Sequence, residues 1–321
     1  MKASRINRYG GPEVLFVADI EKPVPNDNEV LVKVHAASIN PLDWHVMRGT
    51  PYFMRALTGL LKPKKGFKTL GADVAGEVEQ IGKGVTSLKL GDHVFGDIFN
   101  YGYGAIAEYV CVPVEALVLK PENISFEEAA GVPVAALTAY HGLNKYGAVR
   151  AGSEVLINGA SGGVGTFAVQ LAKFYGANVT GVCSTRNIDL VKDCGATDVI
   201  DYTETDLMKL DRKFDLIIDM VGNLSLSDYK KLLTAHGNCA VVGFGGMSHL
   251  MSIGLLGGKR IKMVDFKSNQ KDMQYLANLL ENKDISTVID RSYSLEETSE
   301  AITYLETSRA RGKVVIIPDK G

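Results

Sequence analysis

The sequence predicts an α/β fold in which a doubly wound parallel sheet of six strands is joined to a second, β-rich domain. Three observations support this prediction. The chain has 321 residues, which is long for one hydrophobic core. Its first 120 residues are rich in short β segments separated by turn residues, and its middle alternates apolar strands with helical patterns. We place the β-rich domain at residues 1–120 and 271–321, and the sheet domain at residues 121–270.

In the first half, alternating apolar residues bounded by Gly, Pro and Asp indicate strands. They fall at residues 14–20, 29–39, 76–82, 93–98 and 107–113. The segments at 45–66 and 97–106 are expected to be loops that shape a substrate pocket, as is a later one at 246–260.

The middle of the chain contains six strands rich in apolar and β-branched residues, a composition typical of a buried parallel sheet. They are predicted at residues 154–160, 178–184, 198–202, 214–222, 238–246 and 261–266. Helices are predicted at 164–176, 187–195, 270–284 and 296–308. A last strand at 312–318 is expected to rejoin the β-rich domain.

Composition excludes several classes of function. With 46% apolar residues, 22% charged residues and a net charge of −2, nothing indicates a nucleic-acid partner. The longest apolar run, residues 129–140, is too short to cross a membrane. The four cysteines form no CxxC pair, and the start MKASRINRYGG lacks the apolar stretch of a secretory signal. We therefore expect a cytoplasmic protein with reduced thiols.

The stretch LINGASGGVGTFAVQLAK, residues 156–173, is the most informative in the chain. A predicted strand ends, close-set small residues follow, and a helix begins, which is the context of the dinucleotide-binding G-x-G-x-x-G fingerprint. Ala160 takes the tight-turn position, Gly162 lets the backbone approach a pyrophosphate, and Gly165 lets the helix pack on the strand. The predicted cofactor-binding turn comprises Ala160, Ser161, Gly162, Gly163, Val164 and Gly165. The alternative is a turn with a structural role alone.

The second strand of this domain indicates which dinucleotide is bound. NAD-preferring folds usually carry an acidic residue there, whereas this strand ends in Ser184-Thr185-Arg186-Asn187. A hydroxyl and a guanidinium suit a 2′-phosphate, because hydrogen bonds from Arg to phosphate are strong. The sequence therefore predicts NADPH bound by Ser184 and Arg186, unless Arg186 is a solvated surface residue.

Several motifs together resemble the medium-chain dehydrogenase/reductase superfamily, and in particular its zinc-free branch of NADPH-dependent quinone oxidoreductases and enone reductases. The resemblance runs from end to end and implies a Rossmann dinucleotide-binding domain with a GroES-like catalytic domain. The motifs are AASINPLDW (36–44), LGADVAGEVEQIGKGVTSLKLGDHVFG (70–96), GVPVAALTAYHGL (131–143), GASGGVG (159–165) and CSTRN (183–187).

The resemblance also implies that the chain works without a metal. Zinc-dependent members bind zinc through a Cys, the His of a Gly-His-Glu triplet, and a further Cys or Asp. This sequence has Asn40, Ala72 and Val134 at the matching positions, and the cysteine-rich lobe for a structural zinc is missing. Zinc sites need three or four thiolate, imidazole or carboxylate ligands. We expect no metal, and we expect Asp73 to accept hydrogen bonds in a structural role.

The function implied is hydride transfer from NADPH to a quinone or an α,β-unsaturated carbonyl such as an enone or a 2-alkenal. Asn40, Tyr52 and Thr138 are the expected catalytic residues: Asn40 as an amide donor, Tyr52 as a phenol donor, and Thr138 beside the nicotinamide. The alternative for Asn40 is that it only shapes a turn, and the alternative for Tyr52 is that it only packs. The alternatives are a zinc-free carbonyl reductase or alcohol dehydrogenase, or an NADPH-binding redox sensor with weak catalysis.

Further cofactor contacts are implied at strand ends. These positions are Tyr202, Val221, Gly222, Gly243, Phe244 and Gly245. The partner is a small-molecule substrate, and a homodimer formed through edge strands is expected by resemblance. Residues 51–68 mix apolar side chains with four lysines and are expected to form a lid over a lipophilic substrate. The alternatives for the lysines are a solvated face, which is favoured, and contact with a membrane surface.

Overall fold

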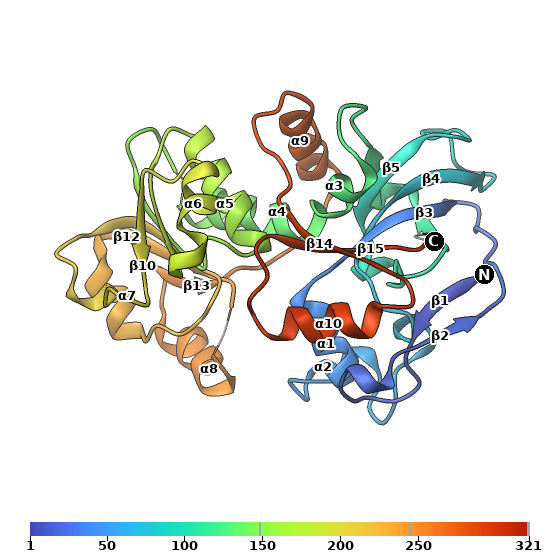
Figure 1. The fold of residues 1–321 in the computed structure, drawn as a ribbon, viewed down its shortest axis with the longest axis horizontal. Coiled ribbons are helices and arrows are strands. Elements are labelled where there is room, and N and C mark those ends of the chain that lie inside the picture. Colours follow the sequence, from blue (N-terminus) through green and yellow to red (C-terminus); the bar gives the residue numbers. More distant parts are fainter. Residues whose placement is uncertain (148, 244, 320–321) are drawn as a thin grey trace. The chain divides into compact units, whose positions relative to one another are not determined.

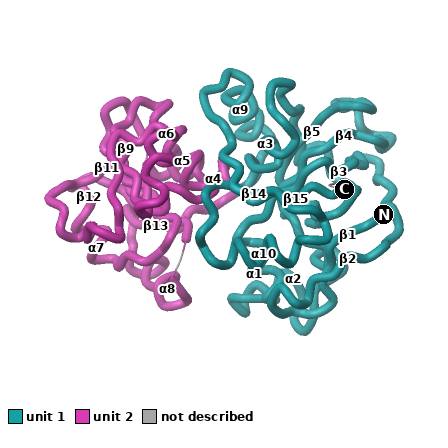
Figure 2. The backbone as a smooth tube through the Cα atoms, in the orientation of Figure 1, with its two compact units in different colours: residues 1–134, 268–321 teal, residues 135–267 magenta. Residues whose placement is uncertain are grey.

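The computed structural model describes residues 1–147, 149–243 and 245–319. The chain folds into two compact units, unit 1 with Met1–Val134 and Ser268–Gly321, and unit 2 with Ala135–Lys267 (Figure 2). Residues 121–134 and 268–270 thus fall in unit 1, although the sequence places them in the sheet domain. The reason for the first segment is that α3 (Phe126–Ala130) packs on β3 (Glu29–Ile39) and β4 (Asp73–Ile81) of unit 1.

Unit 2 is built on a parallel sheet of six strands in the order β10-β9-β8-β11-β12-β13. Their bounds are β8 (Glu154–Asn158), β9 (Asn178–Cys183), β10 (Asp198–Asp201), β11 (Phe214–Asp219), β12 (Leu233–Val241) and β13 (Ile261–Met263). The order reverses between β8 and β11, which is the doubly wound arrangement predicted from the sequence, and the predicted fold class is confirmed.

The helical segments of unit 2 connect these strands. They are η5 (Gly142–Gly147), α5 (Gly163–Phe174), η6 (Thr185–Asn187), α6 (Ile188–Asp193), η7 (Leu207–Lys209), α7 (Leu226–Leu232) and α8 (Met247–Leu256). The boundary between the units falls inside α4 (Pro133–His141). The expectation of a loop at 246–260 was wrong, because α8 occupies most of it. Glycines that flank and interrupt this segment lower its apparent helix propensity.

Unit 1 is built on a sheet of seven strands, which follow the order β14-β15-β3-β4-β5-β7, with β6 paired to β3 outside this path. The remaining bounds are β5 (His93–Asp97), β6 (Tyr109–Pro113), β7 (Leu117–Leu119), β14 (Ile289–Ser294) and β15 (Lys313–Ile317). A separate pair joins β1 (Lys2–Arg5) to β2 (Phe16–Asp19). The last strand, β15, pairs antiparallel with β3, so the end of the chain returns to the sheet of the first half.

Short helices flank the sheet of unit 1. They are η1 (Pro12–Val14), α1 (Pro41–Arg48), α2 (Met54–Thr58), η2 (Lys65–Phe67), η3 (Phe99–Tyr101), η4 (Val114–Ala116), α9 (Gln270–Glu281) and α10 (Thr298–Glu306). In Figure 1, α10 lies beside α1, and the two helices are in contact. Helix α2 and part of α1 occupy the segment 45–66, so the expectation of a loop there was only partly correct.

Each unit has a buried apolar core. In unit 1 the alternating residues Val30, Val32 and Val34 of β3 are fully buried, and in unit 2 Leu156 and Ile217 lie in the centre of the sheet and are equally buried. Among the described residues, no helix is long and apolar enough to cross a membrane.

Candidate functional site

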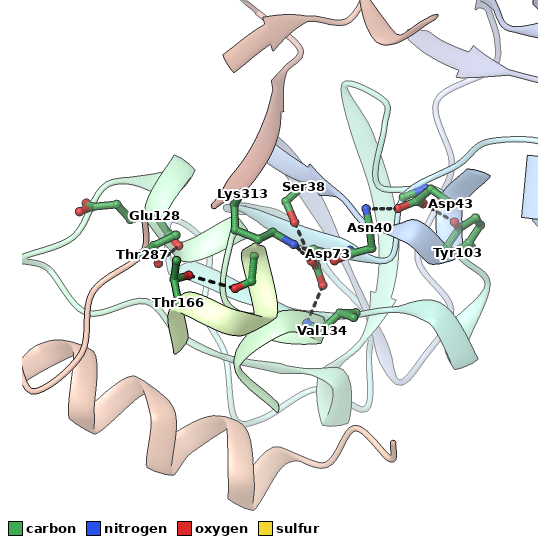
Figure 3. Close-up of polar contacts among 12 residues, drawn as sticks. Ser38, Asn40, Asp43, Asp73, Tyr103, Glu128, Val134, Thr166, Thr287 and Lys313 are labelled. Atoms are coloured by element: carbon green, nitrogen blue, oxygen red, sulfur yellow. Dashed lines mark hydrogen bonds and ion pairs between the residues drawn. The ribbon is translucent and has the colours of Figure 1, made fainter. Parts of the chain in front are cut away.

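A buried carboxylate, Asp73, is the centre of a polar cluster in unit 1 (Figure 3). The register of β3 and β4 sets Ser38 opposite Asp73, and the Ser38 hydroxyl donates to Oδ2 at 2.6 Å. The Asn40 amide nitrogen donates to the same oxygen at 2.8 Å, and the Val134 backbone N–H donates to Oδ1 at 2.9 Å. Asp73 therefore accepts hydrogen bonds on both oxygens, as expected of a structural carboxylate.

A buried lysine completes this cluster, and the sequence analysis did not identify it. Lys313 is the first residue of β15, whose next residue, Val314, pairs with Ile39 of β3. Its side chain is 3% exposed, and the ammonium donates to Asn40 Oδ1 at 2.7 Å and lies 3.5 Å from Asp73 Oδ2. Burial lowers the pKa of Lys313, while the negative charges of Asp73 and Asp43 act in the opposite direction. In the sequence it resembles any lysine at the start of a strand.

Asp43, on α1, fixes the backbone around Asn40. Its Oδ2 accepts from the Asn40 backbone N–H at 2.7 Å, and its Oδ1 accepts from the Gly71 N–H at 2.9 Å and from the Tyr103 hydroxyl. Burial raises the pKa of Asp43 to about 6, and these hydrogen bonds limit the increase. Asn40 is the N-cap residue of α1, and its side-chain amide bonds both Asp73 and Lys313.

A third carboxyl group, that of Asp97, lies opposite Asp73 in the register of β4 and β5. It is 1% exposed, and its Oδ1 accepts from the Phe99 N–H at 3.0 Å. Burial, and secondarily the charge of Asp73, raises the pKa of Asp97 to about 7. Burial therefore makes the negative charges of this cluster costly in desolvation, and the ammonium of Lys313 offsets part of that cost.

The positions matched to zinc ligands in the superfamily do not fit a zinc ion. Asn40 and Val134 donate to Asp73 through an amide and a backbone N–H, and Ala72 presents a buried methyl group. Zinc needs thiolate, imidazole or carboxylate donors on one tetrahedron. Within the part of the chain that the structure describes, no group of three or more His, Cys, Asp or Glu side chains is placed to hold a metal.

The other two predicted catalytic residues lie apart from this cluster. Tyr52 is 75% exposed, and its ring lies 5.0 Å from the guanidinium of Arg55. No hydrogen bond joins Tyr52 to Asn40 among the described residues of unit 1. Thr138 belongs to unit 2, where it is 6% exposed on α4.

In unit 2, the glycine-rich turn joins β8 to α5. Gly159 adopts a left-handed conformation with φ of 84°, so the tight turn is made one residue before Ala160. A Cβ at Gly165 would overlap the Gly159 carbonyl oxygen, whereas a Cβ at Gly162 would meet nothing closer than 3.6 Å. Gly165 is therefore required for packing, while the space beside Gly162 is left open to a ligand.

The N-terminus of α5 follows this turn and offers anion-binding groups. Gly162 is the N-cap residue, and within the described chain no side chain caps the helix. Ser161, Gly163 and Val164 are partly exposed there. Uncapped N–H groups and the helix dipole favour phosphate at such a position.

The end of β9 lies beside the same turn. Asn187, which is 5% exposed, donates from Nδ2 to the Ser161 hydroxyl at 3.0 Å and to the Ser184 hydroxyl at 3.3 Å. Both hydroxyls accept from Asn187 and keep their own protons for a ligand. Arg186 is exposed next to them, and Tyr202, at the end of β10, is 62% exposed. The sequence analysis did not assign a role to Asn187.

The turn after β11 is organised by a buried carboxylate, that of Asp219, which the sequence analysis also missed. Asp219 Oδ1 accepts from the N–H groups of Val221 and Gly222 at 2.8 and 2.9 Å, and its Oδ2 accepts from the Tyr229 hydroxyl at 2.6 Å. Gly243 allows close approach, because a Cβ there would overlap the Met220 carbonyl oxygen. The remaining two predicted positions, which follow β12, differ: Gly245 is exposed, and Phe244 lies outside the described residues.

Comparison with known proteins matches both halves of the chain to family models of dehydrogenases. Residues 26–122 match the family model described as alcohol dehydrogenase GroES-like domain, and residues 194–316 match the one described as zinc-binding dehydrogenase. The chain is 36% identical to 2-methylene-furan-3-one reductase of Solanum lycopersicum, over 99% of this chain and 79% of that protein.

Solved structures agree with this match. The quinone oxidoreductase of Coxiella burnetii has a TM-score of 0.89 at 33% identity, covering 99% of both chains. The quinone oxidoreductase of Escherichia coli complexed with NADPH has a TM-score of 0.85 at 25% identity, covering 99% of this chain and all of the other. With its two-unit fold, its dinucleotide turn and these relatives, the chain belongs to the medium-chain dehydrogenase/reductase superfamily, among the quinone oxidoreductases and enone reductases.

Proposed function

We propose that this protein is a zinc-independent reductase that uses NADPH to reduce a quinone or an α,β-unsaturated carbonyl compound. The observation that carries the proposal is the Asn40 amide, which stands at a matched zinc-ligand position. Asp73 and Lys313 hold this amide, and one of its N–H groups has no partner among the described residues.

Asn40 supplies what the reduction needs from the protein. As the acceptor carbon is reduced, negative charge builds on the carbonyl oxygen, and a fixed N–H donor stabilises that charge. The amide is 4% exposed, so water competes weakly for this hydrogen bond. Tyr52 and Thr138 are proposed as further contacts to the substrate and to the nicotinamide.

The residues of unit 2 fit a dinucleotide. The open space at Gly162 and the α5 N-terminus would hold the pyrophosphate, and the turns at Val221, Gly222, Gly243 and Gly245 would line the nucleotide at the carboxyl ends of the strands. Ser184, Arg186 and Tyr202 would bind the adenosine 2′-phosphate, which favours NADPH. Bound NADPH supplies the hydride for the reduction.

Quinones and enones suit a site without a metal better than alcohols do. An alcohol must lose its proton before it becomes a good hydride donor, a step that zinc normally assists. A conjugated acceptor needs only stabilisation of its oxygen. The relatives support this class, because one is named as a reductase of a methylene-furanone, a conjugated ketone, and others as quinone oxidoreductases.

The cysteines do not supply a reactive thiol for the alternative function, that of an NADPH-binding redox sensor. Sensor cysteines need a low pKa, since the thiolate is the reactive form. Burial instead raises the pKa of Cys111, Cys183 and Cys194 to about 11, and that of Cys239 well above its ordinary value. None of the four forms a disulfide, which is consistent with the proposed cytoplasmic location.

We also propose a homodimer formed through unit 2. Among the described residues, β13 pairs on one side alone, with β12, and leaves an open sheet edge. Helix α8 contacts β13 and exposes apolar side chains, among them Met251 (56% exposed) and Leu255 (76%). An open edge beside an apolar helix is the kind of surface that a second copy covers. In unit 1, the exposed residues Leu60 and Leu61 support the proposed lid over a lipophilic substrate.

A substrate panel tests the function. Oxidation of NADPH is followed at 340 nm with a quinone, a 2-alkenal and a simple ketone, before and after dialysis against a zinc chelator. We expect turnover of the quinone, the 2-alkenal or both, little turnover of the ketone, and no effect of the chelator. Activity on the ketone alone, or stoichiometric zinc whose removal abolishes activity, would overturn the proposal. Tight NADPH binding without any turnover would favour a binding protein.

A further inference from the structure

We propose that Lys313 is a positioning residue for the reduction: together with Asp73, it holds the Asn40 amide in the one orientation that presents an N–H group to the substrate oxygen (Figure 3). The inference rests on the proposed function, in which Asn40 stabilises that oxygen. It adds a residue that belongs to the last strand of the chain, far in sequence from Asn40.

The two ends of an amide group are chemically different, and the two charged neighbours of Asn40 distinguish them. An ammonium can only donate hydrogen bonds and a carboxylate can only accept them. Lys313 donates to Oδ1 at 2.7 Å, and Asp73 accepts from Nδ2 at 2.8 Å. Rotation of the amide by half a turn would set its oxygen against the carboxylate and its NH₂ group against the ammonium. The charge pair therefore selects one orientation.

In the selected orientation, one N–H of the amide is used by Asp73 and the other has no partner in the described chain. This second N–H is the group that would bind the substrate oxygen. The ammonium also polarises the amide through its charge-assisted hydrogen bond, which strengthens the N–H groups as donors. The ammonium of Lys313 thus acts on the substrate oxygen indirectly, by polarising the Asn40 amide. In this protein the positions that match the zinc ligands do not fit a zinc ion.

Stability alone gives a weak reason for a charge at position 313. The lysine side chain is 3% exposed and Asp73 is fully buried, so both groups lose most of their hydration. A buried ion pair can often be replaced by apolar residues of similar volume without loss of stability. The orientation of Asn40 explains the Lys313–Asp73 pair better, because an apolar side chain at position 313 could not donate a hydrogen bond to Asn40 Oδ1.

A double-mutant cycle on kcat tests the proposal. The variants are Lys313→Met, Asn40→Ala and the two combined, with Lys33→Met as the control because Lys33 is a partly exposed lysine on β3. We expect kcat to fall about 100-fold in Asn40→Ala and roughly tenfold in Lys313→Met. The combined variant should be no slower than Asn40→Ala, because Lys313 acts through Asn40. The dissociation constant of NADPH and the activity of Lys33→Met should stay at wild-type values.

Other outcomes overturn the inference. If the losses in the combined variant multiply, or if Lys313→Met keeps the wild-type kcat, Lys313 does not position Asn40, and the reductase function is unaffected. If Asn40→Ala keeps the wild-type kcat, the proposed role of the amide fails as well. Should Lys313→Met not fold, Asp73→Asn/Lys313→Met removes both charges. A wild-type kcat in that folded variant would contradict the proposal, and a loss of tenfold or more would support it.

Discussion

At the scale of single residues, Asp97 shows how burial makes the stability of this protein depend on pH. Its pKa of about 7 in the folded chain lies above the ordinary value of 3.8. As the pH rises from about 4 to 7, the unfolded chain releases this proton while the folded chain keeps it. The contribution of Asp97 to the free energy of unfolding therefore falls across this window and is level above it.

Asp97→Asn should remove this dependence, because the amide keeps an oxygen to accept from the Phe99 N–H and carries no charge. We expect the free energy of unfolding of the variant, relative to wild type, to increase from pH 5 to pH 8 by on the order of 2 kcal/mol. Thermal unfolding at several pH values measures it. Asp27→Asn, which removes an exposed carboxylate of unit 1, is the control and should show no such trend. An equal trend in both variants would contradict the role of Asp97.

The residues that the sequence analysis found and those it missed differ in one respect. Gly162 and Gly165 are recognisable because the spacing of glycines after a strand carries their function locally. Lys313, Asn187 and Asp219 act through partners that are distant in the sequence or through burial. A single sequence shows neither. A lysine at the start of a strand looks solvated until β15 is known to lie beside β3.

At the scale of elements, the end of β9 and the following η6 form the proposed site for the 2′-phosphate. Arg186→Ala should raise the KM for NADPH roughly tenfold or more and leave the KM for NADH nearly unchanged, since NADH has no 2′-phosphate. Steady-state kinetics with both cofactors measures this. Arg150→Ala removes the same charge from an exposed position of unit 2 and should change neither constant. Equal changes in the KM for NADPH and for NADH in Arg186→Ala would show that Arg186 does not bind the 2′-phosphate.

Elements with a strong local signal were predictable, and those without one were not. All six strands of unit 2 were predicted, because each contains a run of apolar residues, although β12 begins before the strand predicted at 238–246. Strands β1, β7 and β14 were not predicted. Segments of three or four residues, such as β7 and β1, carry too little alternation to stand out, and β14, IDRSYS, has mostly polar residues. Helix α8 was missed because Gly254 interrupts an apolar segment that other glycines flank.

At the scale of the whole molecule, the fold was predictable where the order of elements determines it. Strand–helix alternation implies a parallel sheet. The strand predicted after two helices must join an existing sheet, and β15 does so by pairing with β3. The division between the units was less accessible. Residues 121–134 contain the short helix α3, which packs on β3 and β4. No local sequence pattern indicates this packing.

The homodimer is a property of the whole molecule. It is proposed from the open edge of β13 and the apolar surface of α8. If a second copy covers them, the protein should have twice the chain mass of 34.6 kDa in light scattering after size exclusion. Met251→Lys/Leu255→Lys places two charges on α8 and should yield the monomer mass, because buried unpaired charges oppose association. Leu61→Lys, at a residue of unit 1 that is 94% exposed, is the control and should remain dimeric. A monomeric wild type would show that the protein does not form this dimer. Dissociation by Leu61→Lys, but not by the α8 variant, would place the contact in unit 1.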